Sequence, residues 1–188
     1  MKVAVIGAGN IGGTMGGKWE HAGHEVTYGL REPAKKKGAK TIDGALDEAD
    51  VVLLAVPGSA VAELAREHGK KLEGKVVIDA TNNPRAASFN SWHELEKVIP
   101  GALLYRAFNI YGWEVFANPS LGGEQADLFY CGPEKDAPVV ERLIEDVGVR
   151  PVRVGGMDAV DTVDGLLRLW FTLSRSRGRR IAFKLISD

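Results

Sequence analysis

The chain has 188 residues, and its 24 Lys and Arg residues almost balance its 25 Asp and Glu residues, which gives a formal net charge of −1. This balance argues against a general nucleic-acid or membrane binder. The single cysteine, Cys131, excludes an internal disulfide, and we find no secretory leader pattern and no run of about 20 apolar residues, so we expect a cytoplasmic protein.

Short apolar runs alternate with helical patterns along the chain, as in parallel α/β proteins. Strands are predicted at 2–7, 24–29, 51–56, 75–80, 102–107, 127–131 and 149–154, and helices at 10–22, 59–68, 91–97, 134–147 and most of 159–186. A short strand near 39–42 and a helical turn at 43–49 are also predicted. The pattern favours an α/β, Rossmann-like, doubly wound and mostly parallel sheet, with the direction of the last strands left open. We expect a dinucleotide-binding domain at 1–156 and a short C-terminal helical appendage at 157–188, which packs on the domain or on a second subunit.

The first predicted strand runs into the glycine turn Gly7-Ala8-Gly9-Asn10-Ile11-Gly12, which opens a helix. In a dinucleotide-binding turn, Gly7 permits the tight turn, Gly9 lets the backbone approach a pyrophosphate, and Gly12 lets the helix lie close to the strand. The backbone N–H groups of Asn10 and Ile11 then point at the phosphates from the positive end of the helix. The alternative is a tight turn with no ligand.

The end of the second strand determines which dinucleotide is favoured. NAD enzymes usually place Asp or Glu about 20 residues past the glycines, to bind the ribose 2′-hydroxyl. This chain has Tyr28-Gly29-Leu30 and then Arg31, whose guanidinium can hold a 2′-phosphate. We therefore expect NADP(H). The lysines at 35–37 either add positive potential or form a solvated turn, and Glu32 could oppose Arg31.

Three further strand-end loops carry candidate cofactor contacts. Val56 and Pro57 can form an apolar shelf, or an ordinary strand-to-helix turn. Thr81 and Asn82 offer a hydroxyl and an amide to ribose or carboxamide, although the same residue types favour turns without any ligand. Asn109 could position nicotinamide or an acceptor, or cap the following helix.

Together these residues resemble the NADPH-dependent coenzyme F-420 reductases, the coenzyme F-420:NADP oxidoreductase family. The resemblance is carried by 6–12, 23–26, 29–31, 55–57, 74–82, 106–109 and a late stretch, 178–184, which is similar to the family's C-terminal helix. It implies hydride transfer between NADPH and a deazaflavin (8-hydroxy-5-deazaflavin) or a flavin, with Arg31 on the 2′-phosphate and Val56, Pro57 and the 80–83 loop beside the nicotinamide. Leu30 departs from the serine that relatives often carry, and the acidic segment 157–164 departs from their Arg, Asn or Ser. Tyr111 lies in a stretch that varies among relatives and is a candidate to face the acceptor.

No catalytic or metal-binding residue is predicted. None of the four histidines, His21, His24, His68 and His93, lies in a recognisable strand-end loop paired with Asp or Lys. Asp158, Asp161 and Asp164 are three apart, but we expect solvated carboxylates in a first helical turn. Cys131 is expected to be a buried strand residue.

Two functions are compatible with this sequence, one an NADP(H)-dependent reductase and the other a non-catalytic NADP(H)-binding redox sensor. A nicotinamide face covered by Tyr111 or Trp113 would favour the sensor. The arginines of the tail either hold an acidic part of the acceptor or form a charged helix face. The apolar residues of the same tail favour a homodimer.

Overall fold

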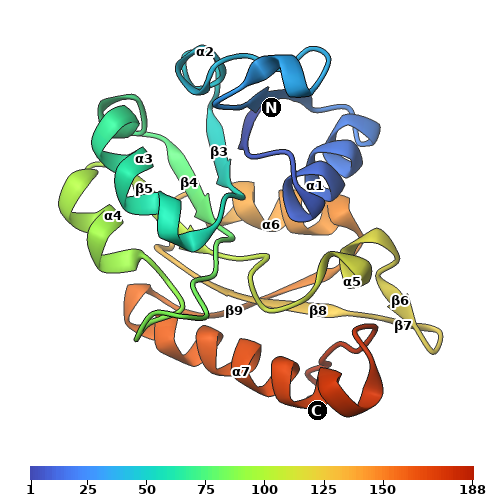
Figure 1. The fold of residues 1–188 in the computed structure, drawn as a ribbon. Helices are drawn as coiled ribbons and strands as arrows, with labels where there is room; N and C mark the ends of the chain where they lie inside the picture. Colours follow the sequence, from blue (N-terminus) through green and yellow to red (C-terminus); the bar gives the residue numbers. More distant parts are fainter.

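The chain is built around one seven-stranded sheet with the order β2-β1-β3-β4-β5-β8-β9 (Figure 1). The computed structural model describes residues 1–188. The strands are β1 (Lys2–Ile6), β2 (Glu25–Gly29), β3 (Val51–Leu54), β4 (Val76–Asp79), β5 (Leu103–Arg106), β8 (Asp127–Cys131) and β9 (Arg150–Gly155). The first five are parallel, β8 is antiparallel to β5, and β9 is parallel to β8. The predicted Rossmann-like, mostly parallel α/β fold is confirmed.

The connections between these strands are mainly helices. They are α1 (Asn10–His21), α2 (Ile42–Leu46), α3 (Val61–His68), α4 (Trp92–Val98), α5 (Trp113–Ala117) and α6 (Ala137–Val147), with a small hairpin of β6 (Ser120–Leu121) and β7 (Glu124–Gln125). Helix α7 (Val160–Arg177) follows the last strand. Helix α5 and the hairpin were not predicted. The strand predicted near 39–42 is only a single bridge between Gly29 and Lys40, followed by α2. No helix is both long enough and apolar enough to cross a membrane.

Both faces of the first five strands are covered, which explains why these strands read as continuous apolar runs. Successive side chains of a strand point to opposite faces. Val3 and Val5 of β1 therefore pack in the cluster that contains Trp19 of α1, while Ala4 and Ile6 pack in the cluster formed with α2, α3 and α4. The carboxyl ends of these strands emerge together at one edge of the sheet, where a doubly wound fold binds its ligands.

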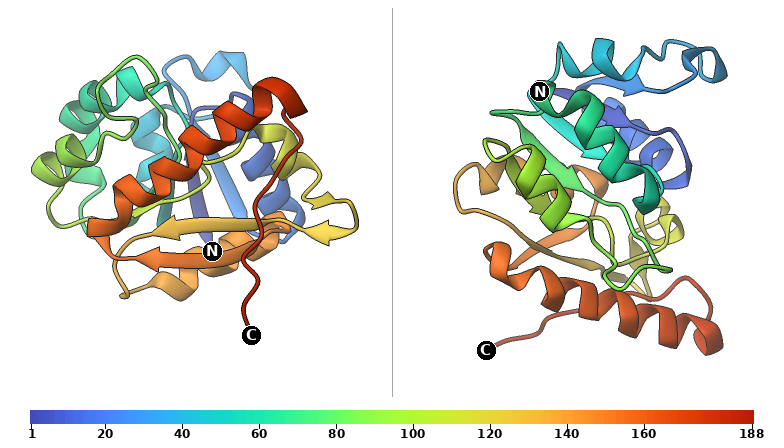
Figure 2. Two further views of the ribbon diagram at one scale, coloured as in Figure 1. Left: turned by 90° about the horizontal axis from the view of Figure 1, so that it is seen from below. Right: turned by 60° about the vertical axis from the view of Figure 1, so that its left-hand side comes forward.

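Helices α6 and α7 lie on opposite sides of the β8–β9 pair (Figure 1). Helix α7 ends at Arg177, and Gly178 follows with a φ of +80°. The remaining residues run in an extended path back across the start of β8 (Figure 2). There the Asp127 N–H donates to the carbonyl of Phe183 (3.1 Å). The prediction of helix over most of 159–186 is therefore wrong beyond 177, because a glycine ends the helix and the tail's hydrogen bonds go to β8. The stretch 178–184 is likewise not helical.

Candidate nucleotide-binding site

The glycine turn follows β1 and lies against the ends of its two neighbours in the sheet, β2 and β3. Gly7 directly follows β1 with a φ of +104°, a conformation that favours glycine, and its N–H donates to the carbonyl of Gly29 at the end of β2 (3.1 Å). A Cβ atom at Gly7 would lie 2.5 Å from the backbone oxygen of Ala55, just beyond β3. This position therefore has no room for a side chain.

The N-terminus of α1 is open. Gly9 precedes the helix with no side-chain cap, and a Cβ atom placed on it would meet nothing within 4 Å. The N–H of Gly13 donates to the carbonyl of Gly9 (2.7 Å), whereas the N–H groups of Asn10, Ile11 and Gly12 have no acceptor in the chain. These unpaired donors and the positive end of a 12-residue helix favour a bound anion.

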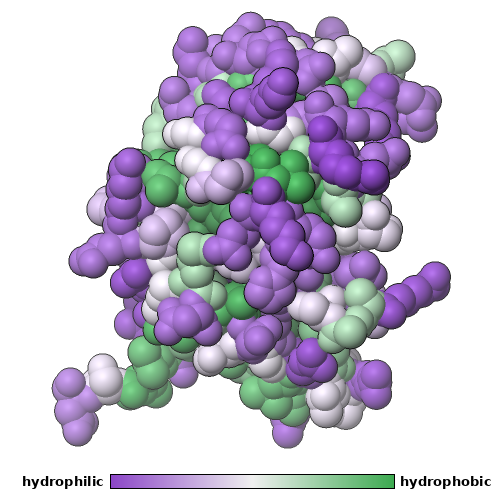
Figure 3. Space-filling model, turned by 90° about the vertical axis from the view of Figure 1, so that its left-hand side faces the viewer, coloured by the Kyte–Doolittle hydropathy of each residue, from purple (hydrophilic) through white to green (hydrophobic).

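An apolar cleft of about 430 Å³ lies beside this turn, between β2 and the start of α3. Its lining residues are Ile6, Gly7, Gly29, Leu30, Arg31, Glu32, Lys35, Ile42, Val56, Pro57, Ser59, Ala60 and Leu64. On the side of the molecule that carries α3 and α4, apolar atoms lie recessed between hydrophilic ones (Figure 3). The structure therefore brings Gly7, Arg31, Val56 and Pro57 together at one cleft. The sequence had placed Val56 and Pro57 beside the nicotinamide, away from the 2′-phosphate expected at Arg31, so their role as cofactor contacts stays a prediction.

Arg31 stands at the rim of the cleft, where its side chain is 61% exposed. Its Nη2 atom donates to the Glu63 carboxylate of α3 (2.5 Å), while Glu32 pairs instead with Lys35 (2.7 Å). The acidic neighbour of Arg31 is thus a residue 32 positions away, which no local motif could identify. Of the lysines at 35–37, only Lys35 lines the cleft. The Nζ atom of Lys36 lies instead 4.1 Å from the centroid of the Tyr28 ring.

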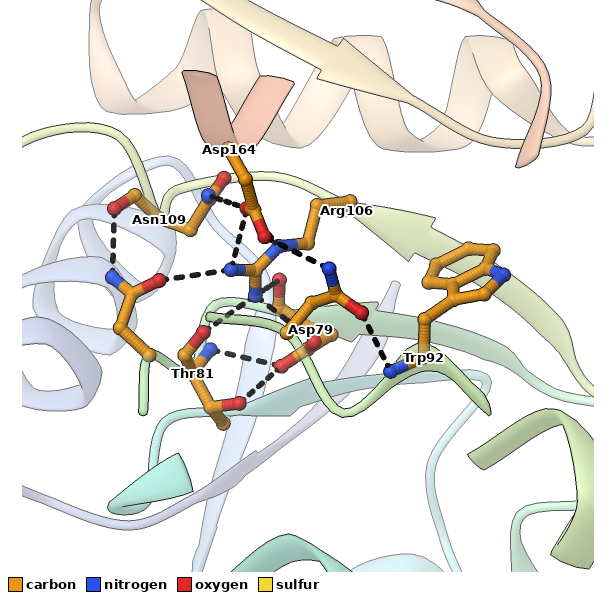
Figure 4. Close-up of polar contacts among 8 residues, drawn as sticks. Asp79, Thr81, Trp92, Arg106, Asn109 and Asp164 are labelled. Carbon is orange, nitrogen blue, oxygen red and sulfur yellow. Dashed lines mark hydrogen bonds and ion pairs between the residues drawn. The ribbon is translucent and has the colours of Figure 1, made fainter. Parts of the chain in front are cut away.

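The other predicted contacts, Thr81, Asn82 and Asn109, lie outside this cleft in a network around Arg106 (Figure 4), in which Thr81 and Asn109 are buried and Asn82 is half-buried. The Thr81 hydroxyl donates to the Asp79 carboxylate (2.6 Å). Asn82 donates to the carbonyl of Asn109 (2.8 Å) and accepts from Arg106 (2.8 Å). Their proposed roles as cofactor contacts therefore stay predictions.

Arg106 has no exposed side-chain surface and joins two carboxylates. Its Nη1 atom donates to Asp79 (2.9 Å), and its Nε and Nη2 atoms donate to Asp164 (3.0 and 2.8 Å). We did not predict this network. The expectation that the acidic segment is solvated is wrong for Asp164, which is 2% exposed, because its carboxylate faces Arg106 rather than water. Asp158 and Asp161 are exposed, and the chain holds no cluster of His, Cys, Asp or Glu side chains arranged for a metal.

One amide in this network retains a free acceptor. Asn109 is 1% exposed, and its Nδ2 atom donates to Asp164 (3.0 Å). Its Oδ1 atom is buried without a hydrogen-bond partner. A buried acceptor of this kind is uncommon in folded proteins and normally has a partner in protein, water or ligand.

Tyr111 and Cys131, which the sequence analysis discussed, are both buried. Tyr111 is 4% exposed and lies against Phe183 of the tail, whose N–H donates to the Tyr111 hydroxyl (2.9 Å). The expectation that Tyr111 faces an acceptor is therefore wrong. Cys131 is buried as predicted, and burial raises the pKa of its thiol to about 12, so a nucleophilic role is disfavoured.

The fold and the open α1 terminus are those of a Rossmann-type dinucleotide-binding domain. Within that class, residues 2–83 match the family described as "NADP oxidoreductase coenzyme F420-dependent". This N-terminal segment is similar to that family, and the resemblance inferred from the sequence is confirmed there.

Among solved structures, a protein of Arthrobacter sp. FB24, provisionally described as an F420-dependent NADP reductase, has a TM-score of 0.86 with 23% identity and covers 100% of both chains. A hypothetical protein of Sinorhizobium meliloti is 29% identical with a TM-score of 0.71, covering 85% of this chain and 87% of the other. The Aspergillus terreus reductive aminase solved with NADPH has a TM-score of 0.68 with 19% identity and covers 93% of this chain and 62% of its own. At their low identities, the first and the third support the fold.

The curated relatives are longer proteins. Glycerol-3-phosphate dehydrogenase [NAD(P)+] of Pseudomonas syringae pv. tomato is 25% identical over 148 residues, which is 66% of this chain and 41% of the relative. The metalloreductase STEAP3 of Rattus norvegicus is 22% identical over 182 residues, or 89% of this chain and 37% of the relative. The chain thus spans about two fifths of the length of these relatives.

Proposed function

We propose that this protein is an NADP(H)-dependent oxidoreductase that transfers hydride between the nicotinamide and coenzyme F-420 or a related flavin-like acceptor. The observation that carries the coenzyme preference is the placement of Arg31 at the rim of the cleft that adjoins the open N-terminus of α1. The family match over 2–83 and the F-420 description of the Arthrobacter structure support the choice of acceptor. A cytoplasmic location and a homodimer stay predictions.

The residues of the site fit the dinucleotide. The free N–H groups of 10–12 would hold the pyrophosphate, and Arg31 would hold the 2′-phosphate after release from Glu63. The apolar shelf of Val56 and Pro57 would lie against the ribose, and the 80–83 loop would flank the nicotinamide. When bound, the nicotinamide supplies or accepts the hydride.

The available side chains suit transfer between two rings better than oxidation of an alcohol. An alcohol substrate needs a positioned acid or base for its oxygen-bound proton. The histidine–carboxylate pairs lie elsewhere: His24 with Asp146, just before β2, and His68 with Asp43, between α3 and α2. For two planar rings, holding them in contact supplies most of the catalysis. The chain's contribution under this proposal is to bind and orient.

The positions of the residues around the site do not support the sensor alternative. That alternative predicted that Tyr111 or Trp113 covers the nicotinamide face. Tyr111 is instead committed to the core through its hydroxyl, which donates to the carbonyl of Asp127 (2.7 Å). Trp113, at the start of α5, is 39% exposed. The reductase remains the function that we propose.

Nucleotide oxidation tests the activity directly. The purified protein is mixed with NADPH and, in separate reactions, with oxidised deazaflavin, FMN or FAD, while the absorbance of NADPH is followed. Oxidation with the deazaflavin is expected. Oxidation with FMN or FAD alone would assign a flavin acceptor, and NADPH binding without turnover in any mixture would contradict the reductase and favour the sensor.

The coenzyme preference is tested with Arg31→Ala. Loss of a hydrogen bond to a charged group costs about 1.5–3 kcal/mol, so NADPH should bind roughly tenfold to a hundredfold more weakly while NADH is unaffected. The matched control is Arg66→Ala, which removes an exposed arginine of α3 that does not line the cleft. Equal affinity of the wild-type protein for NADH and NADPH would contradict the role given to Arg31.

A further inference from the structure

Asp164 is the one carboxylate of α7 that is buried. Four donors reach it: Arg106 through Nε and Nη2 and Asn109 through Nδ2 (3.0 Å) at one oxygen, and Asn90 through Nδ2 (2.8 Å) at the other. Asp161, almost one turn earlier on the same helix, is exposed and makes no side-chain hydrogen bond or ion pair. Asp164 is therefore held by partners that all lie outside α7.

These partners lead from α7 to the carboxyl ends of β4 and β5. Arg106 ends β5, and besides Asp164 it donates to the carbonyl of Thr81 (2.5 Å) and to the Oδ1 atom of Asn82 (2.8 Å). Asn82 in turn donates to the carbonyl of Asn109 (2.8 Å). An unbroken series of hydrogen bonds thus connects one side chain of α7 with both loops at these strand ends (Figure 4).

The physical chemistry of this network favours a single arrangement. Two carboxylates, Asp79 and Asp164, share one guanidinium in a region where all three side chains are 3% exposed or less. A buried charged group that loses a hydrogen-bond partner is strongly disfavoured, so the loops cannot shift without breaking buried hydrogen bonds to Arg106 and Asp164. A network of this kind fixes the backbone of the loops as well as the side chains.

We infer that Asp164 is a positioning residue, which acts through Arg106 to hold the 81–82 backbone and Asn109 where the nicotinamide end of the dinucleotide binds. The inference rests on the proposed function, which places that end at these loops. The adenosine end lies at the cleft of β2 and α3, and no residue of the network lines that cleft. A change at Asp164 should therefore affect the two ends of the ligand differently.

The experiment compares the whole dinucleotide with its adenosine half. Affinities for NADPH and for 2′,5′-ADP are measured by calorimetry on the wild-type chain, Asp164→Asn and the control Asp161→Asn. Asp164→Asn removes the charge with little change in shape and is expected to weaken NADPH by about tenfold or more, while 2′,5′-ADP changes by less than about twofold. The fluorescence of bound NADPH, which reports the environment of the nicotinamide, should change in the same variant. Asp161→Asn should resemble the wild-type chain in all three measurements.

Other results overturn the inference. Unchanged NADPH affinity in Asp164→Asn would show that the loops are set without this carboxylate, and equal losses of both ligands would show a general structural role. If Asp164→Asn does not fold by circular dichroism, Asn90→Ala decides, because it removes one donor and leaves Arg106 paired. It should weaken NADPH but not 2′,5′-ADP, and unchanged or equally reduced affinities would again refute the inference. A wild-type chain that binds neither ligand would refute the proposed function, and with it the inference.

Discussion

Gly7 and Gly9 stand two residues apart in the same turn, yet the structure gives them different roles that substitution by alanine can separate. Gly7 has a φ of +104° and a backbone oxygen 2.5 Å from the place of a Cβ atom. Strain of about 1–3 kcal/mol and overpacking of about 1–3 kcal/mol should together destabilise Gly7→Ala by about 2–6 kcal/mol. For a chain of this length, that lowers the Tm by about 4 °C or more.

Gly9→Ala should do the reverse. Gly9 has a φ of −72°, which alanine adopts freely, and open space around the new methyl group. Reduced freedom of the unfolded chain should stabilise the variant by about 0.4–1 kcal/mol. The methyl group would, however, keep a pyrophosphate from the N–H groups of α1, and the loss of about 1.5–3 kcal/mol weakens NADPH roughly tenfold to a hundredfold.

Thermal unfolding without ligand and calorimetric titration with NADPH measure the two effects on the same preparations. We expect Gly9→Ala to combine an unchanged or higher Tm with weak binding, and Gly7→Ala to show a lower Tm. Wild-type affinity in Gly9→Ala would refute the placement of the pyrophosphate against this turn. A wild-type Tm in Gly7→Ala would refute the turn geometry.

Two further predictions concern stability. Gly16→Ala would place a methyl group 2.6 Å from a tyrosine ring carbon of β2, at a cost of about 1–3 kcal/mol that outweighs the helix gain of about 0.5–1 kcal/mol, whereas Gly17→Ala on the open side keeps that gain. Urea unfolding should move their midpoints in opposite directions, and parallel shifts would contradict this reasoning. Burial alone would raise the pKa of Asp127, but hydrogen bonds from Arg150 and from a backbone N–H of the tail hold it below its ordinary value. This stabilisation is complete above the unfolded pKa, near 3.9, and disappears as the pH falls through the lower folded value. Asp127→Asn should therefore be less stable than the wild-type chain at pH 7, with a difference that shrinks towards pH 3, and a constant difference would exclude this linkage.

The sheet could be predicted because each of its main strands is recognisable from its own local sequence. A strand buried on both faces is a short apolar run, and the run at 127–131 matches β8 residue for residue. The placement of Gly7 and Arg31 at one cleft was predictable for a similar reason. Gly7, Gly9 and Arg31 lie within 25 residues of one another, in a βαβ unit whose geometry is fixed by the order of its elements.

The predictions failed where structure depends on contacts distant in sequence. The helix over 159–186 was extended too far because the tail contains apolar residues, although these pack across β8 in an extended path. Gly178, whose φ is +80°, is a helix stop signal that the sequence itself carries. The pairing of Arg31 with Glu63 joins the loop after β2 with α3, and α2 and β3 lie between them in the chain. No local pattern distinguishes Glu63 from Glu67, the other carboxylate of α3.

The Arg106 network is the clearest of these cases and bears on function. A fully buried arginine is exceptional, and its partners are 27 and 58 residues away, so only the folded chain reveals them. The family match ends at residue 83, before Arg106, Asn109 and Asp164. The coenzyme preference can therefore be argued from the shared segment, whereas the loops that would face the acceptor are fixed by residues beyond it. For this reason the choice of acceptor must be tested on this chain, with several ring systems, rather than transferred from relatives that share its first half.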